Sequence, residues 1–256
     1  RRGVVTMRKV ISEKLQQIEI QENIRILHAV ESGSRAWGFA SPDSDFDVRF
    51  IYVRPRDYYL KLERTRDVLE FPINDLLDVN GWDLQKALRL LHRSNPTLLE
   101  WFRSPVVYKE TDFSHEFIPL MQNYFSSKRG LYHYLSMADG NYREYLRGEM
   151  VRAKKYFYVL RPLLACRWIL RTNTPPPMLF SELAAADLPA HLNESVQELL
   201  RIKMEVPEMK LIPRVNEINA FIEEKLPRIK EQIRSLPEEH GQGYDELNEL
   251  FLKYLW

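Results

Sequence analysis

One short stretch near the N-terminus constrains the fold of this chain more than any other. It begins with Gly33-Ser34 and ends, after ten intervening residues, with two aspartates separated by one residue, Asp45 and Asp47. Apolar and aromatic residues around and after these aspartates predict a strand over residues 45–53. Because successive strand side chains point to opposite faces, both carboxylates are expected on one face, roughly 6.6 Å apart along the strand.

This arrangement favours chemistry that brings a metal ion next to a phosphate. Two parallel carboxylates on a rigid strand make an oxygen-rich site for a divalent cation. The Gly-Ser turn offers backbone N–H groups and a hydroxyl to a phosphate. Metal beside phosphate indicates phosphoryl or nucleotidyl transfer. The competing interpretation is a solvated strand face without chemistry.

The composition is that of a globular protein with one large domain or two modest ones. The chain has 256 residues, of which 45% are hydrophobic and 29% charged, and its net charge of +1 predicts no partner. Its single cysteine, Cys166, lies in an apolar run, which predicts a buried packing residue and a reducing, cytoplasmic location. No apolar run reaches the ~18 residues of a membrane span, so no membrane partner is expected. The start lacks the apolar core of a signal peptide, and the sequence leaves open whether Met7 is the natural first residue.

The order of patterns along the chain predicts strands and helices first and helices alone afterwards. From about residue 115 onward only helical patterns remain, which predicts a mixed domain at 1–110 and a helical domain at 111–256. The expected strands are 24–31, 45–53, 68–73, 76–79 (closing at Gly81) and a short piece at 106–108. The expected helices before residue 110 are 8–22, 34–39 (a turn or helix), 57–62, 83–92 and one that opens at Pro96 with Asn95 as its cap.

A two-aspartate site usually needs a third acid, to share the metals or to take a proton from the nucleophile. We favour Asp78, because it stands between two apolar residues on a predicted strand that is followed closely by a helix. Glu70 has the same apolar-acid-apolar pattern and is the rival. Either acid could instead lie on a solvated strand face.

Three cations flank these acids. Arg35 follows the Gly-Ser turn, and Arg49 alternates with the aspartates along the strand, so it shares their face. Arg49 could hold a phosphate or pair with a carboxylate, and the sequence favours neither. Lys86, on the helix after the third acid, could reach the cleft or be an ordinary solvated lysine.

The stretch 128–171 combines basic and aromatic residues. It holds ten Lys or Arg against three Asp or Glu, together with eight aromatic residues. Lys154, Tyr158 and Arg161 fall on one helical face. Basic charge interleaved with aromatic rings suits a phosphate backbone and stacked bases. The alternative is that the rings are core and the cations ordinary helix surface.

The Gly-Ser pair, the ten-residue gap and the Asp-x-Asp motif together resemble the signature of the DNA polymerase β-like nucleotidyltransferase superfamily. Longer stretches of the sequence resemble one branch of this superfamily, the predicted nucleotidyltransferases found in bacteria and phages near RNA-ligase repair systems. This resemblance spans about residues 20–170. Its stretches are Glu31–Gly38, Ser44–Phe50, Gly81–Lys86, Asn95–Trp101 and Lys154–Leu164.

This resemblance implies an α+β fold, with a mixed-sheet nucleotidyltransferase palm followed by an all-α C-terminal domain. It implies two Mg²⁺ ions (or Mn²⁺) and a nucleoside triphosphate. Asp45 and Asp47 would bind metal, and Asp78 would be the third catalytic acid, as metal ligand or general base. The expected nucleotide-binding residues are Gly33, Ser34, Arg35, Arg49, Lys86, Lys154 and Tyr158.

The sequence therefore predicts a Mg²⁺-dependent nucleotidyltransferase that moves a nucleoside monophosphate from a triphosphate to a hydroxyl acceptor. RNA is the expected acceptor, in repair or end modification. Two alternatives stay open: transfer to a small molecule or a protein, and a non-catalytic nucleotide-binding module. The sequence identifies neither the nucleotide, the acceptor nor the oligomeric state.

Overall fold

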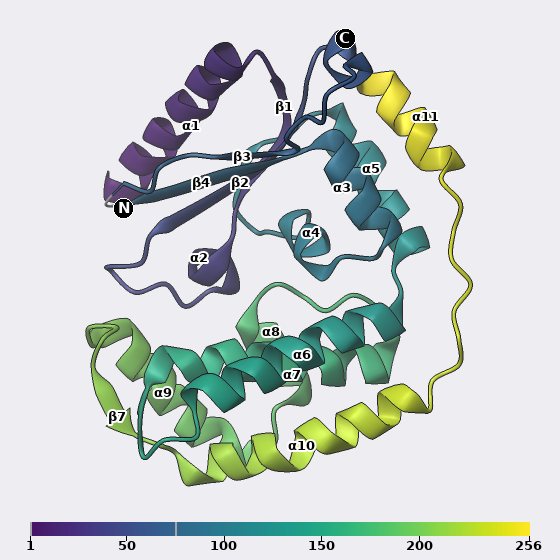
Figure 1. Ribbon diagram of the computed structural model, residues 1–256. Helices are drawn as coiled ribbons and strands as arrows, with labels where there is room; N and C mark the ends of the chain where they lie inside the picture. The colour runs from purple at the N-terminus through teal and green to yellow at the C-terminus, as the bar shows by residue number, and fades with distance from the viewer. Residues whose placement is uncertain (1, 75) are drawn as a thin grey trace. The chain divides into compact units, whose positions relative to one another are not determined.

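The computed structural model describes residues 2–74 and 76–256 and divides the chain into two compact units (Figure 1). The first unit comprises residues up to 36, 45–124 and 241–256, and the second comprises 37–44 and 125–240. The units therefore do not follow a single cut at residue 110. The first unit continues through one more helix, and its last segment comes from the C-terminal end of the chain.

A five-stranded mixed sheet forms the centre of the first unit, in the order β3-β4-β2-β1-β5. The central pair β2 and β4 is parallel, and the other pairings are antiparallel. The strands are β1 (Arg25–Glu31), β2 (Phe46–Val53), β3 (Val68–Glu70), β4 (Leu77–Asp83) and β5 (Val107–Lys109). This sheet, with the helices around it, confirms the predicted α+β class.

The two faces of this sheet serve different purposes. Helix α1 (Arg2–Glu22) packs its apolar residues Ile11, Leu15 and Ile18 against one face, together with β2 residues such as Val48 and Phe50. Because side chains alternate along a strand, the residues between these β2 positions point to the opposite face. That second face carries the acidic residues described below.

Helices follow the sheet strands where the sequence predicts them. Asn95 caps its helix by accepting a hydrogen bond from the Leu98 N–H, with Pro96 in the first turn, as expected. Asp83 caps the preceding helix in the same way, accepting from the Gln85 N–H. The helix that Asp83 caps is α3 (Leu84–His92), and the helix that Asn95 caps is α4 (Pro96–Trp101). The unit also contains α2 (Gly33–Trp37), the 3₁₀ helix η1 (Arg56–Leu60), α5 (Asp112–Tyr124) and α11 (Asp245–Tyr254).

Two strand boundaries differ from the prediction. Strand β3 ends at Glu70 instead of continuing to Ile73, because Pro72 has no N–H to donate to a ladder. Strand β4 does not close at Gly81 but runs through it to Asp83. The Phe50 ring occupies the place where a side chain at Gly81 would stand, so this glycine serves close packing within the strand.

The second unit is a helical bundle with its own apolar core. Cys166 is fully buried in this core, as predicted. The unit also holds a two-stranded antiparallel sheet of β6 (Met150–Arg152) and β7 (Leu211–Pro213), which the expectation of helices alone missed. Its helices are α6 (Ser127–Tyr145), α7 (Ala153–Thr172), α8 (Phe180–Asp187), η2 (Ala190–Leu192), α9 (Asn193–Glu205) and α10 (Asn216–Arg234). In the described part of the chain, no helix combines the length and the apolar character that crossing a membrane requires.

Candidate active site

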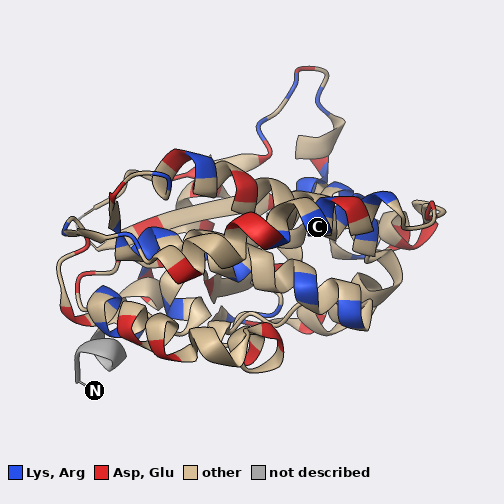
Figure 2. Ribbon diagram, turned by 90° about the horizontal axis from the view of Figure 1, so that it is seen from below, with Lys and Arg blue, Asp and Glu red and all other residues tan. Residues whose placement is uncertain are grey.

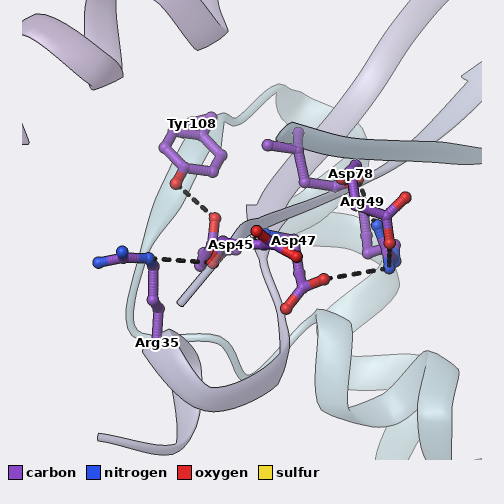
Figure 3. A network of polar contacts seen from close by, with 8 residues as sticks. Arg35, Asp45, Asp47, Arg49, Asp78 and Tyr108 are labelled. Carbon is purple, nitrogen blue, oxygen red and sulfur yellow. Dashed lines mark hydrogen bonds and ion pairs between the residues drawn. The ribbon is translucent and has the colours of Figure 1, made fainter. Parts of the chain in front are cut away.

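Asp47 and Asp78 lie side by side on the sheet face that α1 leaves free. The parallel register of β2 and β4 pairs these two residues directly, and each side chain is 28% exposed. The guanidinium of Arg49 contacts both carboxylates, 2.8 Å from Asp78 Oδ2 and 3.5 Å from Asp47 Oδ1 (Figure 3). The structure thus places beside Asp47 the acid that we favoured over Glu70. It also places Arg49 on carboxylates, one of its two expected roles.

Asp45 is exposed and precedes β2, which begins at Phe46. Asp45 therefore stands one residue before the strand that was expected to include it. Its main chain is held instead by Arg35, whose Nε donates to the Asp45 carbonyl at 3.1 Å while its guanidinium lies over the Phe46 ring. Its charge still contributes to raising the pKa of Asp47, so the two carboxylates interact.

Gly33 approaches Asp47 so closely that no larger residue fits. Its φ is +61°, a left-handed conformation that glycine adopts without strain, and an added Cβ would overlap Asp47 Oδ2. The Ser32 N–H donates to the Asp47 carbonyl at 2.8 Å, immediately before this turn. Ser34 follows within α2. The Gly-Ser turn, expected near the aspartates as a phosphate site, is thus in direct contact with the second aspartate.

Negative charge accumulates around Asp47. Burial is the largest cause of its raised pKa, and the charges of Asp78 and Asp45 raise it further, whereas Arg49 and Arg35 act in the opposite direction. An ionised Asp47 is therefore costly in this arrangement. A bound cation would relieve that cost, which is the electrostatic condition for a cation site.

Glu31 is a buried acid of this region that sequence reasoning named only as part of a motif. It is 1% exposed, and burial raises its pKa to about 7. It accepts hydrogen bonds from the Asp47 N–H at 2.7 Å and from the Tyr108 hydroxyl at 2.6 Å. The available signal was a charged residue at the end of an otherwise apolar strand.

The other predicted residues lie further from this pair or in the second unit. Glu70 is largely exposed and pairs with Arg66. Lys86 pairs with Asp67 at 3.7 Å and lies 6.0 Å from the Trp82 ring centre. Within the part of the chain that the structure describes, Glu70 and Lys86 form ion pairs with these partners and not with Asp47 or Asp78.

Lys154 and Tyr158 belong to α7 of the second unit, and their role in nucleotide binding stays a prediction. Lys154 pairs with Glu208 at 2.6 Å, and Tyr158 lies edge-on to Trp37. Arg161, expected on the same exposed face, is 3% exposed and donates to the Met178 carbonyl, so its charge is used inside the bundle. Along the helices, acidic and basic residues are mixed (Figure 2).

The donor chemistry of the site fits a hard divalent cation, although its present arrangement is not a closed metal site. Among residues 2–74 and 76–256, no group of three or more His, Cys, Asp or Glu side chains is placed to hold a metal ion. The carboxylates of Asp45, Asp47 and Asp78 nevertheless supply the oxygen ligands that Mg²⁺ takes in proteins. The Arg49 guanidinium now provides the positive charge between two of them.

Comparison with known proteins identifies the family. The profile of the RNA repair pathway DNA polymerase beta family matches residues 7–253. The chain belongs to this family. The sequence motifs resemble this family over about residues 20–170, and the profile extends the similarity to nearly the whole chain.

The chain is also similar to a curated bacterial protein and to a solved structure. The uncharacterized protein YcgL of Bacillus subtilis is 45% identical over 251 residues, covering 96% of this chain and 95% of its own length. A nucleotidyltransferase-like protein from Exiguobacterium sibiricum is 17% identical with a TM-score of 0.32, covering 88% of this chain and 75% of its own.

Proposed function

We propose that this family member is a Mg²⁺-dependent nucleotidyltransferase that transfers a nucleoside monophosphate from a triphosphate to a hydroxyl group of RNA. One observation carries the proposal: Asp47 and Asp78 stand in register on adjacent parallel strands, with the Gly33 turn against the Asp47 carboxylate. The carboxylates can hold a cation, and the N–H groups of the adjacent turn can bind the phosphate that accompanies this cation. The family assignment supports the same class of reaction.

Each residue of the site has a role in this proposal. Asp45, Asp47 and Asp78 would hold Mg²⁺, which when bound stabilises the charge that develops on the transferred phosphate. Asp78 would also accept the proton of the attacking hydroxyl. The new bond joins the acceptor oxygen to the α-phosphorus, the bond from that phosphorus to the β-phosphate oxygen breaks, and pyrophosphate leaves.

Arg49 and the Gly-Ser turn would bind the triphosphate. A guanidinium that contacts two carboxylates can exchange one of them for phosphate oxygens, since it recognises both with the same planar set of donors. Backbone N–H groups and the hydroxyl at Gly33-Ser34 would contact the phosphates from the other side of Asp47. Arg35 adds a cation that already lowers the pKa of Asp47.

RNA is proposed as the acceptor on the strength of the family and of the chemistry of α7. The Lys155 ammonium lies 3.6 Å from the centre of the Tyr145 ring and 4.9 Å from that of Tyr158, which combines charge with stacking surfaces. Arg152 stands at the start of this helix. Such a group contacts phosphates and unstacked bases without requiring a given sequence.

The test supplies the purified protein with each α-labelled nucleoside triphosphate, Mg²⁺ or Mn²⁺, and a pool of RNAs. We expect label to enter RNA with one or more nucleotides, and Asp47→Asn to lower the transfer by roughly 10³-fold. Glu70→Gln is the matched control, an exposed acid on β3, two strands away from Asp47, that should keep full activity. Equal transfer by wild type and Asp47→Asn would contradict the site assignment, and label found only on a small molecule or a protein would contradict the RNA acceptor.

A non-catalytic nucleotide-binding module is the second candidate, and Arg49 is the observation that favours it. Its guanidinium occupies the space between Asp47 and Asp78, where a cation would otherwise bind. Such a module would bind a triphosphate equally well with Mg²⁺ and with EDTA and would transfer no label. Binding that requires the metal would exclude it.

A further inference from the structure

The ladder between β1 and β2 ends in an unusual way next to the site. Glu31 pairs with Val48 in the antiparallel register, so the next residue, Ser32, lies opposite Asp47. In a regular hydrogen-bonded pair, two opposite residues exchange both N–H···O bonds. Here the Ser32 N–H donates to the Asp47 carbonyl at 2.8 Å, but the Asp47 N–H donates to a side chain, Oε1 of Glu31, at 2.7 Å.

Glu31 is itself fixed on every side. Its second carboxylate oxygen accepts from the Tyr108 hydroxyl at 2.6 Å, its main-chain N–H donates to the Val106 carbonyl at 2.9 Å, and its carbonyl accepts from the Ser104 hydroxyl. The side chain is 1% exposed. A rigid carboxylate therefore stands behind the main chain of Asp47.

The turn at Gly33 explains why a side chain is used at this point. The chain must leave the ladder directly after Ser32 so that the Gly33 main chain can lie against the Asp47 carboxylate. Leaving the Asp47 N–H without an acceptor would be unfavourable, because a donor removed from water needs a partner. The Glu31 carboxylate supplies that acceptor while the main chain turns away.

We propose that Glu31, held by Tyr108, is a positioning residue that fixes the main chain of Asp47 and thereby aims its carboxylate at a divalent cation. The inference rests on the proposed function, because it assigns Asp47 to a cation. Partners behind a metal ligand orient that ligand, and replacing them typically lowers metal affinity or activity by about 10- to 100-fold. Neither Glu31 nor Tyr108 needs to touch the metal or the nucleotide for this effect.

The test compares matched pairs of variants at the two ends of the sheet. Glu31→Gln keeps the side-chain size but leaves one oxygen acceptor for two donors, and Tyr108→Phe removes only the hydroxyl. Glu19→Gln is the control for the first, since Glu19 Oε1 accepts from the Ile26 N–H at the other end of β1. Tyr59→Phe is the control for the second, since its hydroxyl donates to Asp83.

The first readout is the dissociation constant for Mn²⁺ alone, measured by electron paramagnetic resonance without nucleotide. We expect it to rise by about 10- to 100-fold in Glu31→Gln and by a smaller factor in Tyr108→Phe, with both controls at the wild-type value. The second readout is kcat and KM for label transfer, where we expect kcat to fall and KM for the triphosphate to stay unchanged. Circular dichroism checks that each variant folds. If Glu31→Gln does not fold, the Mn²⁺ affinity of Tyr108→Phe decides whether the positioning role holds.

The outcomes separate this inference from the function on which it rests. Unchanged Mn²⁺ affinity in both site variants, or an equal loss in the controls, would overturn the positioning role even if the wild type transfers label. Mn²⁺ binding by a wild type that transfers no label would overturn nucleotidyl transfer, and the affinity comparison would still decide the role of Glu31. A wild type that binds no Mn²⁺ would overturn both.

Discussion

The parallel strand pair β2–β4 carries an acid at each end, and the two ends hold their acids differently. At one end Asp47 and Asp78 lie opposite each other, and at the other end Asp83 lies opposite Tyr52. Asp83 is 2% exposed, yet its two oxygens accept from the Gln85 N–H at 2.7 Å and from the Tyr59 hydroxyl at 2.9 Å. At the first end, the acids share the guanidinium of Arg49.

The difference shows that a raised pKa alone does not separate a structural acid from a functional one. Burial is the largest cause of the raised pKa at both Asp47 and Asp83, and for Asp83 the value reaches about 6. At Asp83, however, hydrogen bonds from Gln85 and Tyr59 oppose the shift, whereas at Asp47 the neighbouring carboxylates reinforce it. Asp83, which hydrogen-bond donors satisfy, caps a helix. Asp47 lies near two further carboxylates, whose charge Arg49 and Arg35 only partly offset, and this arrangement suits a bound cation.

Asp47→Asn should produce the largest effect of these changes. It should lower the rate of label transfer without lowering the free energy of unfolding. We expect label transfer to fall by roughly 10³-fold, because the loss of several kcal/mol of transition-state charge stabilisation corresponds to that factor. The free energy of unfolding should stay constant or rise at neutral pH, because the change removes a charge whose pKa is raised by burial. Urea unfolding and single-turnover transfer measure the two quantities, and a strongly destabilised Asp47→Asn would contradict the comparison.

His28 should make the stability of the first unit sensitive to acid for reasons unrelated to the site. It is 3% exposed, stacks on Phe102, contacts the Ser114 hydroxyl, and has its pKa lowered by burial from 6.5 to about 4. The unfolded chain binds this proton more readily, so the contribution of His28 to stability falls as the pH drops from about 6.5 towards 4, by up to roughly 3 kcal/mol. The raised pKa values of Glu31 and Asp83 act in the opposite direction over this range, so the effect of His28 is the difference in slope between wild type and His28→Gln. Urea unfolding at several pH values measures both slopes, and equal slopes would refute the assignment.

Asp83→Ala should reverse the pattern of Asp47→Asn. We expect unfolding to become easier by about 2 kcal/mol, since the change removes a helix cap, worth about 1 kcal/mol, and leaves the Tyr59 hydroxyl without its acceptor. Transfer per folded molecule should stay at the wild-type rate. Urea unfolding and activity normalised to folded protein test this, and a rate loss similar to that of Asp47→Asn would mean that both ends of the strand pair serve catalysis.

The sequence was informative where local chemistry decides the structure. The Asn95-Pro96 pair predicts a helix start because a side-chain acceptor and a residue without an N–H both suit that position, and the helix begins there. The Gly-Ser spacing places the turn near the aspartates, but the direct contact of Gly33 with Asp47 could not be read from it. Apolar-acid-apolar alternation alone could not choose between Asp78 and Glu70, because the choice depends on which strands become neighbours.

The rest depended on contacts between distant parts of the chain. Asp45 lies outside β2 although its neighbours alternate as in a strand, and no local signal marks where the strand begins. Glu31 acquires its role only from Asp47 and Tyr108, which the sheet brings to it from 16 and 77 residues away. The segment 241–256 joins the first unit from the far end of the chain, which no cut along the sequence could represent.

Arg49→Gln should lower the free energy of unfolding less than Asp83→Ala does, and it tests the comparison between the two ends most directly. Its guanidinium, with 18% of its side chain exposed, is the positive group between Asp47 and Asp78. Without it, we expect the pKa of Asp47 to rise further and the protein to lose about 1 kcal/mol at neutral pH, with less loss at acid pH, where Asp47 is protonated.

Carbon-detected NMR of the aspartate carboxyls and urea unfolding at low and high salt would measure both effects. Arg66→Gln, which breaks the exposed pair with Glu70, is the control and should change neither quantity. If Asp47 keeps its pKa in Arg49→Gln, Arg49 does not offset the negative charge at this end of the sheet. In that case Arg49 would serve Asp78 alone, and the two ends of the strand pair would differ in their hydrogen-bond donors and in the carboxylates near Asp47, without a contribution from Arg49.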